Sequence, residues 1–315
     1  MYRLLTTQSP EQLLGQLGDD VCAALPVPLQ PRFLRLSAHY LEDNAHLFER
    51  TGHHLVRVTA QYTCFHDDAG VARYLPGLRV RARGLDLELI PAPDIAAACF
   101  PAGAAAEVLA EVRDKITGNH WLWFASSNMG WDLSRSRFGL FGDFSDEERA
   151  HMVRAPTPVE IVQTHYAGDR RTQFLRLREE SVANKEQVGV AVIARDHDRL
   201  AELFGDALRL CLARVEEEEL AAILWTAHGD EAALVEWVGS ASFRRDAVAP
   251  QVVYAFFCWL QRQGFQRLIA ARYEWFLPPI WSEVMARDSV DKERARHHEQ
   301  TWSRLQARGL RELTP

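Results

Sequence analysis

Lysine is almost missing from this 315-residue chain, in which only three of the 36 basic residues are lysines, Lys115, Lys185 and Lys292. None of the three lies in a glycine-rich loop, and neither G-x-x-x-x-G-K-[ST] nor G-x-G-x-x-G opens a helix in the sequence. A P-loop enzyme and a dinucleotide-binding Rossmann domain are therefore excluded. Composition leaves two interpretations of the excess of arginine open: a GC-rich coding sequence, or arginines selected for two-pronged contacts with anions.

Paired cysteines and long apolar runs are also missing. The five cysteines are scattered and form no C-x-x-C pair, so we expect neither a zinc ribbon nor a disulfide framework, and a reducing compartment fits best. No stretch approaches the roughly 18 apolar residues of a membrane-spanning helix. The first residues also lack the basic and apolar segments of a signal peptide. The sequence therefore predicts a soluble, cytoplasmic protein.

The net charge of −7 disfavours a protein that binds nucleic acid by neutralising phosphates. Apolar residues make up 47% of the chain and charged residues 25%, which is the usual mixture of a globular protein with a sizeable core. At a typical domain size of roughly 100 to 200 residues, the length allows one large domain or two smaller ones.

Alternation of apolar and polar residues predicts two groups of strands. The predicted strands are 55–65, 78–82 and 85–89 in the first group, and 159–166, 172–178 and 187–194 in the second. Turn residues at 66–70 indicate that the first group is an antiparallel meander. Ser145, with Glu148 three positions later, predicts a helix start with a capping box.

Helical spacing of apolar residues dominates after residue 196, and the predicted helices there are 200–215, 230–237, 250–263 and a charged helix from 289 to 309. We therefore expect an α+β fold, with antiparallel β meanders in the N-terminal and middle parts and a mostly helical C-terminal part. The expected division is an α+β domain over 1–195 and a mostly helical region over 196–315 packed against it.

Metal and nucleophile signatures are weak. His53–His54 and His297–His298 are adjacent pairs whose side chains point in different directions. His228 and Glu231 are three apart, which would place them on one helical face, but no second half of a carboxylate-bridged site can be assembled. The chain has no G-x-S-x-G elbow, and His165 with Asp169 fits an ordinary exposed hairpin histidine better than a catalytic pair. We predict no metal and no cofactor.

Arg79, Arg81 and Arg83 lie on one face of a predicted strand. The preferred interpretation is a solvated face whose arginines pair across strands with acids such as Asp86 and Glu88. The alternative is a sheet face that binds RNA or another anionic ligand.

The stretch 119–148 is dense in aromatic and polar side chains. It predicts a ligand pocket with aromatic walls and a few convergent polar groups, in which Arg135 and Arg137, two apart in an extended segment, would grip a carboxylate or phosphate. The competing interpretation is a packed core segment beside a Ser/Arg loop. The candidate ligand-binding residues are His120, Trp123, Asn128, Trp131, Asp132, Arg135 and Arg137.

The predicted helix 250–263 is apolar almost all round, so it is either central in the core or part of an interface, with Tyr254, Phe257 and Trp259 as candidate interface residues. Because no catalytic motif is present, the main prediction is a binding or interaction protein, a subunit or adaptor of a larger bacterial assembly with a protein partner or self-association. The alternative is an enzyme of unrecognised class that binds a small anionic substrate in the aromatic/Arg pocket. A nucleic-acid binder using the arginine row is the third hypothesis.

Overall fold

The computed structural model describes residues 3–7, 13, 27, 30–43, 55–67, 70–82, 85–91, 122–124, 129–155, 157–187, 195–240, 248–270 and 311–312. The chain divides into two units, each discontinuous in sequence. Unit 1 comprises Met1–Ser127, Ile193–Leu203 and Tyr273–Arg287, and unit 2 comprises Asn128–Val192, Phe204–Arg272 and Asp288–Pro315. The division therefore differs from the predicted one at residue 195.

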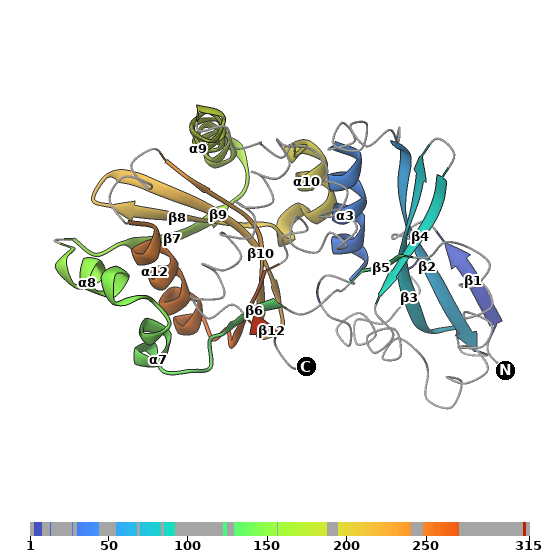
Figure 1. The fold of residues 1–315 in the computed structure, drawn as a ribbon, viewed down its shortest axis with the longest axis horizontal. Coiled ribbons are helices and arrows are strands. Elements are labelled where there is room, and N and C mark those ends of the chain that lie inside the picture. The colour runs from blue at the N-terminus through green and yellow to red at the C-terminus, as the bar shows by residue number, and fades with distance from the viewer. Residues whose placement is uncertain are drawn as a thin grey trace. The chain divides into compact units, whose positions relative to one another are not determined.

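Unit 1 contains a five-stranded sheet in the order β1-β2-β3-β4-β5 (Figure 1). Its strands are β1 (Arg3–Thr7), β2 (Leu55–Asp67), β3 (Gly70–Ala82), β4 (Leu85–Pro91) and β5 (Leu122–Phe124). Strands β1 to β4 pair antiparallel, which confirms the predicted meander, and β5 joins β4 in parallel. The β3–β4 register sets Arg79 opposite Glu88 and Arg81 opposite Asp86, so the arginine row lies against a row of acids.

Helix α3 (Pro31–Asp43) packs against β2 and β3. The β2 side chains Val58, Ala60, Tyr62 and Cys64 alternate along the strand and are all buried, as period-two patterning predicts. Tyr62 Oη donates to the carbonyl of Pro31 at 3.0 Å, which satisfies a hydroxyl that burial would otherwise leave unpaired.

Unit 2 contains a seven-stranded sheet in the order β12-β6-β11-β10-β9-β8-β7. Its strands are β6 (Met129–Asp132), β7 (Glu160–His165), β8 (Arg209–Val215), β9 (Glu218–His228), β10 (Glu231–Gly239), β11 (Arg267–Ala270) and β12 (Arg311–Glu312). The β10–β11 pair is parallel, and the other pairs are antiparallel. The helices of this unit are α7 (Arg137–Gly142), α8 (Asp146–Arg154), α9 (Gly168–Gln187) and α12 (Val248–Arg262), while α10 (His197–Phe204) ends at the boundary between the units.

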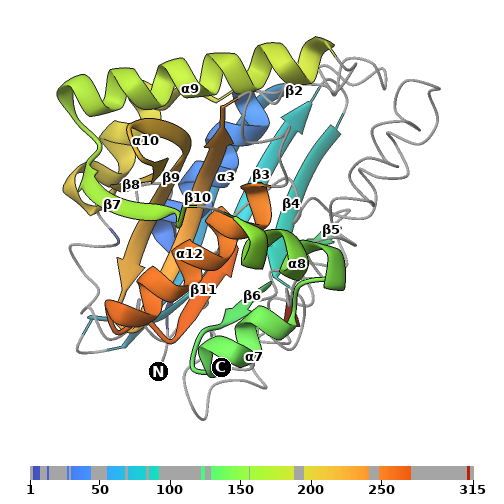
Figure 2. The same ribbon diagram turned by 90° about the vertical axis from the view of Figure 1, so that its left-hand side faces the viewer.

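Helices α9 and α12 cover opposite faces of the unit 2 sheet (Figure 2). Glu236 of β10 pairs with Arg178 of α9, and the next residue, Trp237, meets Phe256 of α12 with ring centroids 6.3 Å apart. Successive strand residues point to opposite faces, so the two helices lie on different sides. The central strands are consequently buried on both faces, and every residue of β9 from Leu220 to Thr226 is buried.

Three secondary-structure predictions were wrong in this unit. Residues 209–215 and 231–237 are strands rather than helices, because a strand buried on both faces is a continuous apolar run without the alternation that would identify it. Residues 172–178 are helical rather than extended, since buried Phe174, Leu177 and Ser181 recur at helical spacing along α9. The C-terminal part is therefore not mostly helical where the structure describes it.

Other predictions were confirmed. The strand at 159–166 is β7, and the apolar helix near 250 is α12. The Ser145 hydroxyl accepts from the Glu148 amide while the Glu148 carboxylate accepts from the Ser145 amide, which is the predicted capping box. The predicted strand 187–194 from residue 188 onward, and the predicted helix from 289 to 309, lie outside the described residues.

Candidate functional site

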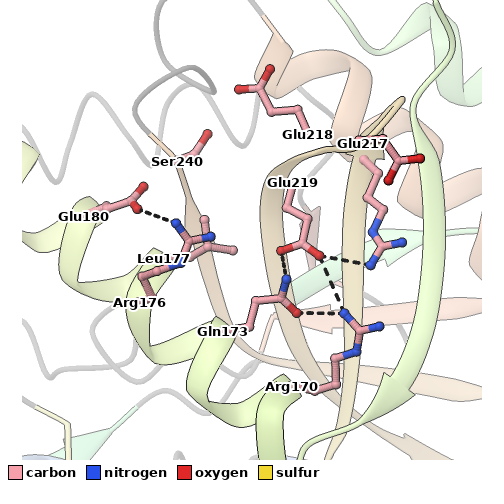
Figure 3. Close-up of a pocket in the computed structure, with 10 residues that line it drawn as sticks. Arg170, Gln173, Arg176, Leu177, Glu180, Glu217, Glu218, Glu219 and Ser240 are labelled. Carbon is pink, nitrogen blue, oxygen red and sulfur yellow. Dashed lines mark hydrogen bonds and ion pairs between the residues drawn. The ribbon is translucent and has the colours of Figure 1, made fainter.

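A charged pocket of about 590 Å³ lies in unit 2, between α9, the β8–β9 hairpin and the end of β10 (Figure 3). The residues lining it are Arg170, Gln173, Arg176, Leu177, Glu180, Arg214, Glu217, Glu218, Glu219 and Ser240. Ser240 directly follows β10, whose neighbour β11 is parallel to it. The pocket therefore lies beside the carboxyl end of β10, where β10 pairs with β9 and no longer with β11, since the parallel pairing ends at Leu234.

A bulge in β9 aims Glu219 into this pocket. Leu212 pairs with Ala222, but Arg214 pairs with Glu219, so β9 has one more residue than β8 over this interval. The extra residue places Glu219 on the same face as Ala222, under α9, instead of on the opposite face. Bulges that redirect a side chain in this way occur often beside active sites.

Glu219 is the centre of the polar contacts in the pocket. Its carboxylate accepts from Arg214 Nη2 at 3.0 Å and from the Gln173 amide, and Arg170 Nη1 lies 3.7 Å away. Figure 3 shows Gln173 and Arg170 of α9 converging on Glu219. Only 10% of the Glu219 side chain is exposed, so its two arginine partners compensate a carboxylate that is largely removed from water.

A second bulge, at Val235 in β10, acts on Glu236. Leu234 pairs with Trp225 and Glu236 with Leu224, so Leu234 and Glu236 point to opposite faces although they are two residues apart. Glu236 thereby reaches Arg178 of α9 at 3.2 Å. Nearby, burial raises the pKa of Tyr166 to about 12, against the opposing effect of Arg171, so this phenol is neutral at physiological pH.

The structure distributes the predicted ligand-binding residues of 119–148 over both units. Trp123 is in β5 of unit 1, whereas Trp131, Asp132, Arg135 and Arg137 belong to unit 2. His120 and Asn128 lie outside the described residues. A common pocket made by these residues stays a prediction.

The predicted ligand-binding residues that belong to unit 2 have contacts with other residues of this unit. Trp131 is buried, with its ring centroid 5.3 Å from that of Phe257. Asp132 Oδ1 accepts from the amide and the hydroxyl of Ser134, at 3.0 and 2.6 Å. Arg135 donates to both carboxylate oxygens of Asp143, at 2.6 and 3.0 Å, and this hydrogen bonding raises the pKa of Arg135. Arg137, the first residue of α7, is exposed.

The candidate interface residues lie on α12. Phe257 and Trp259 are only 2% and 7% exposed within unit 2, and Trp259 packs edge-on against Trp225. Tyr254 packs against Phe141 and donates to the carbonyl of Arg137 at 3.3 Å. Phe257 and Trp259 are thus covered by their own unit, whereas Tyr254 is half-buried, and an interface role for α12 stays a prediction.

The two histidine–carboxylate pairs considered in the sequence also have definite positions. His228 and Glu231 are opposite each other across the β9–β10 hairpin, where Gly229 takes a positive φ of 59°, rather than on one helical face. His165 ends β7 and Asp169 lies in the first turn of α9. Within the described ranges, no group of three or more His, Cys, Asp or Glu side chains could hold a metal ion.

Sequence reasoning missed the Glu219 pocket, because it assigned residues 200–215 to a helix and therefore did not identify the β8–β9 hairpin. Two features of the sequence could have identified the hairpin, although not the contacts that α9 makes with it. The apolar run 210–213 before the acids and the run 220–225 after them fit two strands joined by a tight turn, in which Glu216 has a φ of 56°. Arg214 and Glu219 are the charged residues nearest the apolar part of each strand, where partial burial requires a partner.

No model of a known protein family matches the sequence, and no curated protein matches it. Solved structures do match. FemX aligns with a TM-score of 0.51 at 9% identity, over 84% of this chain and 87% of FemX. The C-terminal domain of a putative lysylphosphatidylglycerol synthetase from Agrobacterium fabrum aligns with a TM-score of 0.41 at 10% identity, covering 74% of this chain and 77% of that domain. A GCN5-related glucosamine N-acetyltransferase region of a fungal β-N-acetylglucosaminidase aligns with a TM-score of 0.35 at 9% identity, covering 86% of this chain and 35% of that one.

The likeness to FemX establishes a shared fold over both units. This likeness overturns the main prediction from sequence, a binding or interaction protein acting as a subunit or adaptor, and favours the alternative, an enzyme of a class that the sequence did not reveal. The absence of a recognisable catalytic motif misled the prediction, since side chains brought together by pairing and bulges leave no local motif. Among the described helices, none is long and apolar enough to cross a membrane.

Proposed function

We propose that this chain is an acyl-transferring enzyme whose unit 2 pocket, around Glu219, binds an amine-bearing acceptor. The observation that carries the proposal is the charged pocket at the carboxyl end of β10, in a chain that shares the fold of FemX. Fold alone does not define an activity, so the support has to come from the charged groups of the pocket and their chemistry.

Acyl transfer to an amine forms a C–N bond and breaks the bond between the acyl carbon and its oxygen or sulfur leaving group. The amine must first lose the proton that it carries as an ammonium group, and the leaving group must gain one. Glu217 and Glu218 line the pocket and are exposed, so their carboxylates can bind the ammonium group and take up its proton.

The fixed groups of the pocket suit positioning. Glu219 is held between Arg214 and Gln173, and its three partners come from both α9 and the hairpin. A constellation supported in this way keeps its geometry while a substrate binds, which is the main requirement for bringing an amine and an acyl carbon together.

The test is transfer of a labelled acyl group by the full chain. Acetyl-CoA and aminoacyl-tRNA, each labelled in the acyl group, are supplied separately as a thioester and an ester donor, with a small-molecule extract as the source of amines. We expect enzyme-dependent label in an acid-stable amide with one of these donors. Absence of labelled amide with both donors would contradict the proposal.

A further inference from the structure

The pocket holds more charge than its internal contacts use, and the unused charge is of both signs. We propose that its ligand is a zwitterion, a compound with an ammonium group and a carboxylate, such as an amino acid or a short peptide. This inference rests on the proposed function in so far as the ammonium group is the acceptor amine, and it adds a requirement for a second, anionic group on the same molecule.

The unused negative charge lies on the hairpin. Within the described part of the chain, neither the Glu217 nor the Glu218 carboxylate takes part in a hydrogen bond or an ion pair, and both side chains are exposed at the pocket wall. Glu219, by contrast, is occupied by Arg214, Arg170 and Gln173. An ammonium group that enters the pocket therefore meets two carboxylates that are not paired with a cationic side chain among the described residues.

The unused positive charge lies on α9. A guanidinium group has five N–H donors. Arg176 uses Nη1 for Glu180 at 3.2 Å, and its side chain is 61% exposed. Arg170 uses Nη1 for Gln173 at 2.9 Å and for Glu219. Both arginines consequently keep N–H donors that these contacts do not use. A ligand carboxylate can accept two hydrogen bonds from such a guanidinium group.

The two charges are separated in space as a zwitterion requires. Figure 3 shows Glu217 and Glu218 on one side of Glu219, and Arg170 with Gln173 on the other. Arg176 lies on the α9 side as well, beside Leu177. A molecule that spans the pocket can therefore present its ammonium group to the hairpin and its carboxylate to α9.

The experiment measures binding of small probes to the full chain by titration calorimetry, without any acyl donor. Glycine, glycylglycine and triglycine test three separations of the two charges. The best of them is then compared with its N-acetyl derivative, which lacks the ammonium group, and its amide, which lacks the carboxylate. We expect each derivative to bind about ten-fold or more weakly, as loss of a hydrogen bond to a charged group implies. Equal binding of the derivatives, or no binding of any zwitterion, would overturn the inference.

Single substitutions assign each charge to its side of the pocket. Glu218→Gln should reduce the preference over the N-acetyl derivative, with Glu217 left in place, and Arg176→Gln should reduce the preference over the amide, with Arg170 left in place. Glu179→Gln, at an exposed α9 position outside the pocket, and Arg154→Gln, at the exposed end of α8, are the matched controls and should keep both preferences. Retention of both preferences in the Glu218 and Arg176 variants would place the ligand elsewhere.

Failure of this inference and failure of the proposed function give different results. Charge-dependent binding of a zwitterion without acyl transfer would contradict the enzymatic proposal and support the zwitterion. Acyl transfer that proceeds equally well onto amines without a carboxylate would support the enzyme and contradict the zwitterion.

Discussion

The two sheets of this protein are built from strands with different kinds of burial. In β2 of unit 1, Val58, Ala60 and Cys64 are buried on one face, while the other face is buried only in part: Arg57 is exposed, Thr59 is half-buried and Gln61 and Phe65 are buried. In β9 of unit 2, seven consecutive residues from Leu220 to Thr226 are buried, because helices cover both faces. One-sided burial leaves a pattern that can be seen in the sequence, whereas two-sided burial removes it.

This difference explains which parts of the fold could be predicted. The meander β2–β4 alternates and was identified, including its antiparallel order. Strands β8 and β10 were assigned to helices, since a short apolar run fits either structure when no alternation is present.

The candidate site was unpredictable for a further reason. Glu219 faces α9 because β9 gains one residue relative to β8, and the sequence carries no residue that marks this bulge. Its partners Arg170 and Gln173 come from a helix 46 or more positions away. These residues come together only in the folded chain, so a local sequence pattern cannot predict their contacts.

The largest expected effect compares a strand that is buried on both faces, β9, with a strand that is buried mainly on one face, β2. Ala221 and Ala222 are adjacent in β9 and point to opposite faces, so Ala221→Glu and Ala222→Glu each bury a charge. We expect each to lower the free energy of unfolding of unit 2 by roughly 3 kcal/mol or more. Thr59→Glu and Thr63→Glu, at half-buried positions of β2, should lower that of unit 1 by about 1 kcal/mol or less.

Hydrogen exchange of the β9 and β2 amides is the measurement, because it reports each unit separately. If either alanine substitution left the free energy of unfolding of unit 2 unchanged, one face of β9 would be open to water, and burial of both faces would be wrong.

The next effect compares the main ion-pair cluster of each unit. Removing the charge of Glu219 leaves the mostly buried Arg214 without its partner, whereas Arg170 is 44% exposed and is solvated by water, so Glu219→Gln should destabilise unit 2 by about 2 kcal/mol. In unit 1, Arg199 pairs with Asp43 at 3.0 Å and Glu42 at 2.9 Å but is one-third exposed. Arg199→Gln should therefore cost about 1 kcal/mol.

Denaturant unfolding followed by hydrogen exchange measures both changes, with Glu202→Gln, at an exposed position of α10, as the control. A larger loss for Arg199→Gln than for Glu219→Gln would reverse the ranking of the two clusters.

A smaller effect, in unit 1, depends on pH. Burial lowers the pKa of His39, and the nearby Arg199 and Arg35 lower it further. The unfolded chain therefore binds a proton more readily than the folded one, so this contribution to stability is present above the usual pKa of about 6.5 and is lost as the pH falls through the lowered value. We expect His39→Gln to flatten the pH dependence of β2 amide exchange below about pH 6.5. An unchanged pH dependence in the variant would rule out His39 as its source.

The smallest effect concerns thiol reactivity. Burial raises the pKa of Cys64 in unit 1 to about 11 and that of Cys211 in unit 2 to about 12, where Trp225 Nε1 also donates to the Cys211 sulfur at 3.2 Å. Both thiols should resist alkylation in the folded protein at pH 8, with Cys258, which is partly exposed, reacting before them. Mass spectrometry of alkylated peptides gives the order, and labelling of Cys211 ahead of Cys258 would show that β8 opens readily.

The central claim is that the pocket around Glu219 is the acceptor site of an acyl-transferring enzyme. Its most direct test is the rate of amide formation by the Glu217→Gln, Glu218→Gln double variant, compared with the Glu179→Gln control, each in the full chain. We expect kcat/KM to fall by at least about ten-fold in the double variant and to stay unchanged in the control. Equal rates in the double variant and the wild-type protein, at unchanged stability, would contradict the central claim.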